Sequence, residues 1–182
     1  WSWIAVILSG LSFNLSALSI EHAASLIASD GANNDLLGWS VAVDGNTAIL
    51  GANKDNSNTG AAYIFVNDGS GNWTQQAKLE GLSAGGEAGF SVAIDGDTAV
   101  VGAYLANAQR GEAWVYSRTG TTWGTGRALS TLTSNACQFC SFFGYSVAVS
   151  GSTLIVGSSA DGGSRNGQRA GIVYVYRQVT QD

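Results

Sequence analysis

Apolar and polar residues alternate with a period of two in residues 90–94, and a short apolar run rich in β-branched residues follows at 98–103. A period of two is typical of a β-strand, whose successive side chains point to opposite faces of a sheet. Between the two segments stands Asp95-Gly96, a dipeptide suited to a tight turn with positive φ. The pattern therefore predicts a β-hairpin over residues 90–103.

Further strands are expected after each hairpin. A polar, glycine-containing loop leads to residues 112–117, which match residues 61–66 and 171–176. These segments are the predicted third strands, and they are rich in aromatic residues. A fourth segment follows another glycine-rich turn at 73–79 and at 123–129. No helical periodicity separates these segments, so we expect meanders of four strands.

The whole unit occurs three times. Residues 38–52 return as 89–103 and again as 144–158. A unit of this length cannot bury its apolar face alone and must stack on its neighbours. The predicted fold is all-β, with three four-stranded antiparallel blades of the propeller type.

The repeated sequence resembles the FG-GAP family, which forms the blades of the integrin α-subunit head and of many secreted bacterial proteins. Gly89-Phe90 together with Val101-Gly102-Ala103 lies close to the family pattern, and the match covers residues 24–177. The resemblance implies a β-propeller that is extracellular or on the cell surface and serves adhesion or binding.

The resemblance also raises the question of calcium. Integrin blades often carry a loop of alternating acidic residues, whereas the loops at 53–58 and 159–163 hold one carboxylate each. Hard cations take six to eight oxygen ligands, several of them charged. The candidate ligands are Asp55, Asn58 and Asp161, but we expect solvated loops and no cofactor.

The ends of the repeat array are unequal. An apolar N-terminal extension, residues 1–23, precedes three repeats at about 31–80, 81–130 and 131–182. The third repeat lacks the segment for an outer strand, while residues 24–30 resemble a fourth strand with no blade of their own. Three blades are fewer than the four to eight of closed propellers, so an incomplete ring is predicted.

Two arrangements would complete the ring. In the first, residues 24–28 of one molecule pair with the open edge of the third repeat of the next, which supplies main-chain hydrogen bonds to an unpaired strand. Such head-to-tail contacts give a ring when the rotation closes and a filament when it does not. In the second, the chain is a fragment of a longer propeller.

The N-terminal extension helps to choose between them. Residues 1–20 carry no charged side chain. The spacing of their apolar residues fits one face of a helix, whereas apolar and polar residues alternate in 11–17 as in a strand. Either form is too apolar to remain in water. We favour an assembly arm over a membrane anchor or an internal propeller strand. The predicted assembly residues are Trp1, Trp3, Ile4, Leu8, Leu11, Phe13, Leu15, Leu18, Leu26, Ile27, Val173 and Val175.

Few residues suggest chemistry. Cys137 and Cys140 form a Cys-x-x-Cys pair, interpreted as a local disulfide in an oxidising compartment, with free thiols as the alternative. His22 is the only histidine and lies in the tail, where it has no expected catalytic partner. Asp44 and Asp95 are interpreted as hairpin residues. No catalytic residues, and no enzyme, are predicted.

The net charge and the aromatic residues limit the classes of binding partner that the sequence suggests. A net charge of −5 with 12% charged residues excludes an electrostatic nucleic-acid binder. The acceptor sequons at Asn14 and Asn72 leave glycosylation open. The aromatic strands could stack on sugars, although such residues more often form blade cores: Trp73, Trp114, Tyr116, Trp123, Tyr174 and Tyr176.

The predicted function is therefore that of a non-enzymatic extracellular structural protein. Its partners are copies of itself, assembled head to tail into a filament or surface fibre, and it contacts a membrane only through the N-terminal segment if at all. The alternative is an adhesion or carbohydrate-binding fragment of a larger propeller, with cell-surface glycans or proteins as partners.

Overall fold

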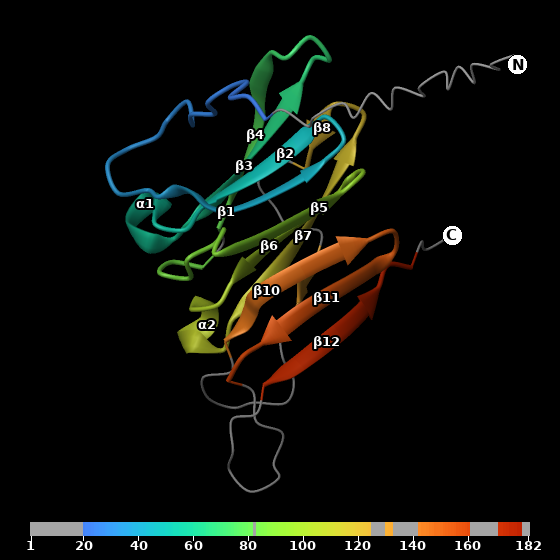
Figure 1. The fold of residues 1–182 in the computed structure, drawn as a ribbon. Coiled ribbons are helices and arrows are strands. Elements are labelled where there is room, and N and C mark those ends of the chain that lie inside the picture. The colour runs from blue at the N-terminus through green and yellow to red at the C-terminus, as the bar shows by residue number, and fades with distance from the viewer. Residues whose placement is uncertain (1–19, 82, 125–129, 133–141, 161–170, 180–182) are drawn as a thin grey trace, which may run out of the picture.

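The chain forms three antiparallel β-sheets stacked face to face, as the computed structural model in Figure 1 shows. The structure describes residues 20–81, 83–124, 130–132, 142–160 and 171–179. The all-β class and the blade-like sheets predicted from the sequence are confirmed. The ring is not closed: among the described residues no fourth sheet joins the two ends of the stack.

The first blade is a meander in which each strand pairs with the next. Its strands are β1 (Leu37–Asp44), β2 (Thr47–Ala52), β3 (Ala61–Asn67) and β4 (Trp73–Glu80), in that spatial order. The short helical turn α1 (Asp55–Asn58) joins β2 to β3. The spatial order follows the sequence because each connection is too short for anything but an antiparallel neighbour.

The second blade repeats this order but has a divided outer strand. Its elements are β5 (Ser91–Asp95), β6 (Thr98–Ala103), α2 (Ala106–Gln109), β7 (Glu112–Thr119), β8 (Thr122–Trp123) and β9 (Ser130–Leu132). Both β8 and β9 pair with β7. The fourth strand predicted at 123–129 is thus found partly later in the chain, and residues 125–129 lie outside the described residues.

The third blade consists of β10 (Phe143–Ser150), β11 (Thr153–Ser158) and β12 (Ile172–Arg177). Within the described part of the chain no fourth strand pairs with β12, so β12 is an edge strand. In the first two sheets an outer strand pairs with the third strand, β4 with β3 and β8 with β7. The open edge of the third blade, at β12, therefore lies where such an outer strand would pair.

The hairpin between the first two strands is the same in each blade. In the second blade Asp95 pairs with Thr98, which leaves Gly96 and Asp97 as a two-residue loop. Gly96 has a φ of +54°, and the predicted positive-φ turn is confirmed. Glycine at the first loop position is favoured because it adopts positive φ without a steric penalty.

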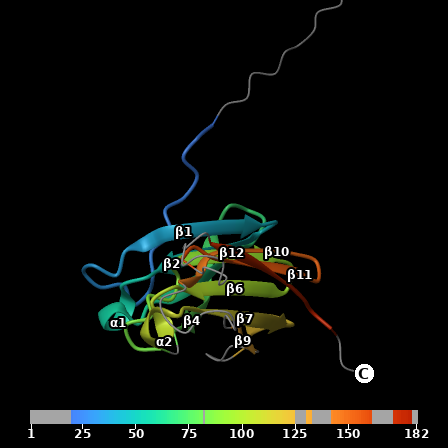
Figure 2. The ribbon, with the colours of Figure 1, turned by 90° about the horizontal axis from the view of Figure 1, so that it is seen from below.

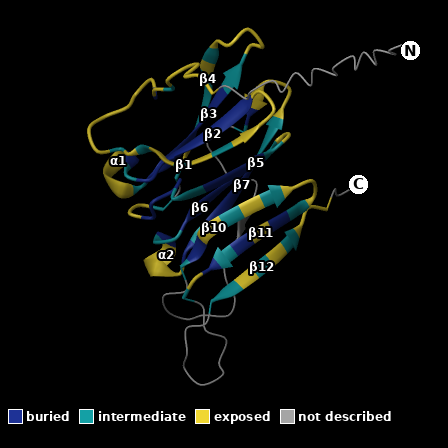
Figure 3. Cartoon of the chain, viewed as in Figure 1, coloured by how far each residue is buried: buried dark blue, intermediate teal, exposed yellow. Residues whose placement is uncertain are grey.

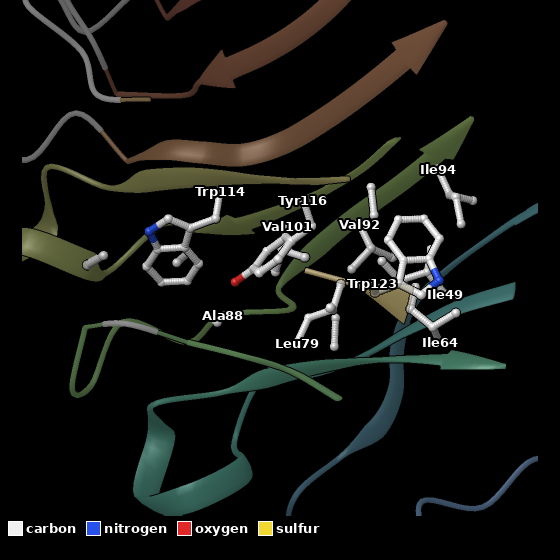
Figure 4. Close-up of a cluster of buried hydrophobic side chains, with 14 residues drawn as sticks. Ile49, Ile64, Leu79, Ala88, Val92, Ile94, Val101, Trp114, Tyr116 and Trp123 are labelled. Carbon is white, nitrogen blue, oxygen red and sulfur yellow. The ribbon is translucent and has the colours of Figure 1, made fainter. Parts of the chain in front are cut away.

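Two apolar layers hold the stack together. The layer between the first and second blades is shown in Figure 4 and includes Ile49, Ile64, Leu79, Val101, Trp114, Tyr116 and Trp123. The layer between the second and third blades includes Val100, Val115, Phe143, Leu154 and Val156. Trp114 and Tyr116 are fully buried in the first layer, so these aromatic residues form core and are not available to stack on sugars.

Residues 20–36 precede the first blade and contain no strand or helix. Ala28 is buried and Leu26 is partly buried against the face of the first blade that points away from the second. Residues 20–25 are exposed and extend away from the body (Figure 2). Across the described residues, the structure contains no helix with the length and apolarity needed to cross a bilayer.

Candidate assembly surfaces

Each blade has two distinct faces, set by the alternation of its strands. We call the face turned towards the previous blade the leading face and the opposite one the trailing face. On the second blade the leading face carries Val92, Ile94, Val101, Trp114 and Tyr116, and the trailing face carries Ala93, Val100, Ala113 and Val115. Inside the stack a trailing face always packs on a leading face.

No described element covers the trailing face of the third blade. Its residues Ile155, Val173 and Val175 are 39%, 64% and 68% exposed. The residues at the same repeat positions in the second blade are Val100, Ala113 and Val115, which are 0%, 0% and 4% exposed. Figure 3 shows exposed positions alternating with half-buried ones along β12, while β11 has one exposed position between two buried ones. An apolar face of this kind is normally covered by another blade.

The leading face of the first blade is uncovered at β1. Val41 and Val43 are each 67% exposed, while Val92 and Ile94, at the same positions of the second blade, are each 8% exposed. The two ends of the stack thus present the two complementary halves of the contact that occurs twice inside it.

A polar cluster holds residues 26–30 against the outer strands of the first blade. The ammonium of Lys78 on β4 lies 2.7 Å from Asp30 Oδ2 and 2.9 Å from Asp55 Oδ2. The Tyr63 hydroxyl lies 2.9 Å from Asp30 Oδ1 and 2.5 Å from Asp55 Oδ2. Two carboxylates therefore share one ammonium and one hydroxyl.

These contacts shift the pKa values of three groups. The hydrogen bond from Lys78 holds the pKa of the Asp30 carboxyl below its ordinary value of 3.8. Burial, together with hydrogen bonds to Asp55 and Asp30, raises the pKa of Tyr63 well above its ordinary value. Burial opposes the charge on Lys78, but its hydrogen bonds to the two carboxylates outweigh this and raise its pKa. Lys78 is therefore charged and Tyr63 is neutral at physiological pH.

Some FG-GAP repeats bind calcium, but the surroundings of Asp55 do not fit that ion. Asp55 is buried, and its carboxylate already accepts hydrogen bonds from an ammonium and a phenol. A cation placed there would face the positive charge of Lys78, whereas calcium sites supply oxygen ligands alone. In the described ranges no three His, Cys, Asp or Glu side chains gather as a metal-ligand group. Asp161 lies outside those ranges.

Neighbouring blades are joined by a repeated seam of hydrogen bonds. Ser40 Oγ of the first blade donates to the carbonyl oxygen of Gly89 at 2.7 Å, and Ser91 Oγ of the second donates to Gly144 at 2.8 Å. Beside each serine lies a glycine, Gly51 or Gly102, at which a Cβ would overlap that carbonyl oxygen. The close approach of the two backbones therefore requires glycine at that position.

The hairpin tips form a second seam. Asp44 Oδ2 accepts a hydrogen bond of 2.7 Å from the backbone N–H of Gly96, and Asp95 accepts one from Gly151. Sequence reasoning assigned Asp44 and Asp95 to their own hairpins and missed this contact between blades. One signal in the sequence could have predicted it: the residue before the turn glycine is Asp in the first two repeats, which have a following blade, and Ser150 in the third.

An aromatic ridge runs across the stack along the second residue of each repeat. The ring centroids of Trp39 and Phe90 are 5.7 Å apart, and those of Phe90 and Tyr145 are 5.0 Å apart. Tyr104 packs against both Phe90 and Tyr145. Trp39 and Tyr145 are exposed. These residues were not predicted from the sequence, although Trp, Phe and Tyr follow the glycine at the start of the three repeats in turn.

The remaining predicted residues are placed as follows. Ile27 is exposed, whereas Leu26 lies on the first blade of its own chain. The Asn58 backbone oxygen accepts a hydrogen bond from the N–H of Glu87. His22 is exposed, 3.2 Å from Ser25 Oγ. Outside the described residues lie Trp1, Trp3, Ile4, Leu8, Leu11, Phe13, Leu15, Leu18, Cys137 and Cys140.

Stacked antiparallel meanders, joined by repeated seams and left open at both ends, define a propeller-type repeat protein whose ring is not closed. A family model described as FG-GAP repeat matches residues 21–65, 73–116 and 130–176. The chain belongs to the FG-GAP repeat family, and the resemblance stated from the sequence is confirmed. Comparison with curated proteins gave no match. FG-GAP repeats are non-catalytic propeller modules, typical of extracellular or surface proteins.

Proposed function

We propose that the chain is a non-enzymatic, extracellular structural protein that assembles head to tail with copies of itself. The trailing face of the third blade of one copy packs on the leading face of the first blade of the next. The observation that carries the proposal is the exposure of Val173 and Val175 at one end and of Val41 and Val43 at the other. The same repeat positions are buried or partly buried wherever two blades of the chain meet.

Strand addition accompanies this contact. The second and third repeat matches begin at the outer strands β4 and β9, so the first match, which begins at residue 21, corresponds to an outer strand ahead of the first blade. Residues 26–30 already lie beside the first blade in the way that β4 lies beside the second. They therefore remain packed on their own blade while presenting an edge to β12 of a neighbour.

Polar contacts support the parallel between residues 26–30 and β4. The Tyr116 hydroxyl donates to the carbonyl oxygen of Glu80 on β4 at 3.0 Å, and the Tyr63 hydroxyl reaches Asp30 at 2.9 Å. Gln76 of β4 accepts from Trp123, while Gln75 accepts from the backbone N–H of Ser29. In both places an outer segment is tied to the third strand and outer strand of the blade that follows it.

The test blocks one of the two proposed assembly faces at a time. Val175→Asp places a charge on the trailing face, and Val41→Asp places one on the leading face; since both side chains are largely exposed, each variant is expected to fold as the wild type does. The wild type is expected to form concentration-dependent oligomers in sedimentation velocity, and each variant alone to be monomeric. An equimolar mixture of the two is expected to give a discrete dimer, because one intact face of each kind remains.

Ser70→Ala in the exposed β3–β4 turn serves as the control and is expected to assemble as the wild type does. A wild type that stays monomeric at high concentration would overturn the proposal and leave further blades of a longer chain as the occupants of both faces. Deletion of residues 1–28 tests strand addition separately, with loss of assembly as the expected result.

A second candidate function, carbohydrate or protein binding by a larger propeller, is favoured by the aromatic ridge. Exposed Trp39 and Tyr145 flank Phe90, and such rings stack on the apolar faces of sugars. Titration of the protein with soluble oligosaccharides, followed by tryptophan fluorescence, is the test. A change that is lost in Trp39→Ala and kept in Trp73→Phe would support binding at the ridge.

A further inference from the structure

The seam between blades occurs twice in full, and the third blade carries half of it. In each complete copy a serine of the first strand donates a hydrogen bond to the carbonyl oxygen of a glycine in the following blade, and a glycine of the second strand leaves room for that carbonyl. The first copy consists of Ser40, Gly51 and Gly89, and the second of Ser91, Gly102 and Gly144. The residues at the same positions of the third blade are Ser146 and Gly157. Serine and glycine are thus present at the end of the stack as well.

The half-seam of the third blade is open. Ser146 and Gly157 line a hollow of about 290 Å³ on the third blade, together with Gly171 and Val173. The three atoms nearest to a Cβ at Gly157 would all belong to Ser146, whereas a Cβ at Gly51 or Gly102 would overlap the carbonyl of the next blade. Among the described residues, then, only the side chain of Ser146 crowds this place, and no neighbouring blade requires glycine at residue 157.

The matching half is at the other end of the stack. Gly38 occupies the repeat position of Gly89 and Gly144, and its φ of +90° is close to their values of +82° and +83°. It is exposed, and apart from its two chain neighbours no described residue has an atom within 4 Å of where its Cβ would stand. Gly38 therefore has the backbone conformation that the seam uses, without a preceding blade among the described residues to receive it.

We infer that Ser146 and Gly157 form a specific seat for the Gly38 backbone of a second copy, with Ser146 Oγ donating to the Gly38 carbonyl. This inference rests on the head-to-tail assembly proposed above. It identifies the partner as another copy of the chain, because the chain itself supplies both halves of a contact that it makes twice internally.

A second contact lies beside the seat. Within the chain, Gly60 bridges Ala88 and Gly111 bridges Phe143, in each case by a parallel pairing between neighbouring blades. The third member of this series would pair Gly171 of one copy with Leu37 of the next. Gly171 has a φ of +76°, like the +80° and +82° of the two paired glycines. The two contacts together fix the register of the docked copy.

The experiment compares the affinity of self-association of three variants with that of the wild type. Ser146→Ala removes one hydrogen bond and is expected to weaken association about threefold to tenfold. Gly157→Ala places a Cβ where the incoming carbonyl must lie and is expected to abolish association at concentrations where the wild type assembles. The double variant Ser146→Ala/Gly157→Ala removes the hydroxyl that the new methyl would meet inside the monomer, and is expected to fold and remain monomeric.

Circular dichroism melting of each monomer provides the folding control, and Ser70→Ala provides the matched serine control. If the wild type assembles and Gly157→Ala assembles equally well, the seat is refuted while head-to-tail assembly stands. If the wild type does not assemble, the proposed function itself fails. If Gly157→Ala unfolds, the test rests on the self-association of the double variant and of Ser146→Ala. Association as strong as that of the wild type in both variants overturns the inference.

Discussion

The ammonium of Lys78 lies 2.7 Å from the carboxylate of Asp30, a residue 48 positions earlier in the chain. This pair, with Asp55 and Tyr63, ties the segment before the first repeat to the outer strands of the first blade. Asp55 lies in the loop where some related repeats use a metal ion, and Lys78 of β4 joins its carboxylate to that of Asp30. The arrangement holds residues 26–30 against the first blade.

Asp30→Asn is expected to loosen the segment without unfolding the blades. The substitution removes the charge that Lys78 and Tyr63 contact, and Leu26 and Ala28 then lose the polar anchor beside their apolar contacts. Hydrogen exchange at the backbone of Ser29 should become faster, since its N–H bonds to Gln75. Global stability should barely change because an exposed ion pair contributes little. Glu21→Gln is the control, and equal exchange in both variants would contradict the expectation.

Acid is expected to release the same segment. The pKa of Asp30 is lowered in the folded protein, so its contribution is complete above the ordinary value of 3.8 and is lost as the pH falls through the folded pKa. NMR titration of the Asp30 carboxyl and of the Ala28 methyl group should show both signals changing together below pH 3.8. An Ala28 signal that stays constant while Asp30 is protonated would show that the carboxylate does not hold the segment.

Trp114 is expected to be among the most costly core positions. It is fully buried between the first and second blades, and Trp114→Ala should lower the free energy of unfolding by about 3–5 kcal/mol. Its indole N–H is buried without a hydrogen-bond partner among the described residues, so Trp114→Phe removes that unsatisfied donor and should cost less than the alanine variant. Urea unfolding measures both, and equal losses would show that ring volume is not what stabilises the layer.

Gly96→Val is expected to destabilise the second blade through the backbone conformation alone. A Cβ at this position meets nothing within 4 Å, but the φ of +54° is unfavourable for a β-branched residue. The loss should be about 1–2 kcal/mol or more. Gly96→Asn is the matched control, since asparagine tolerates positive φ better and should lose less. Thermal unfolding compares the two, and a Gly96→Val variant as stable as the wild type would mean that the hairpin adopts another turn.

Much of this fold follows from local sequence. The alternation in residues 90–94 and the glycine of the turn predict a hairpin because both signals act between residues close in the chain. The return of the same pattern after about fifty residues predicts three blades of one design. These inferences needed no knowledge of which faces meet.

The contacts between blades could not be predicted in the same way. Asp44 bonds to a hairpin 52 residues away, and Ser40 bonds to Gly89, 49 residues away. The sequence also could not show that Leu26 lies on its own first blade, or that Trp114 is core while Trp39 is surface. Both tryptophans follow the local pattern of a strand.

By itself, the sequence determined the family, the repeated meander of strands and the turn that opens each blade, because periodicity and turn chemistry are properties of neighbouring residues. Only the tertiary structure decided which faces remain uncovered and that Lys78 joins Asp30 to Asp55. It also showed that Ser146 and Gly157 retain half of a seam. Burial and close backbone approach depend on how blades stack, and stacking brings together residues some fifty positions apart.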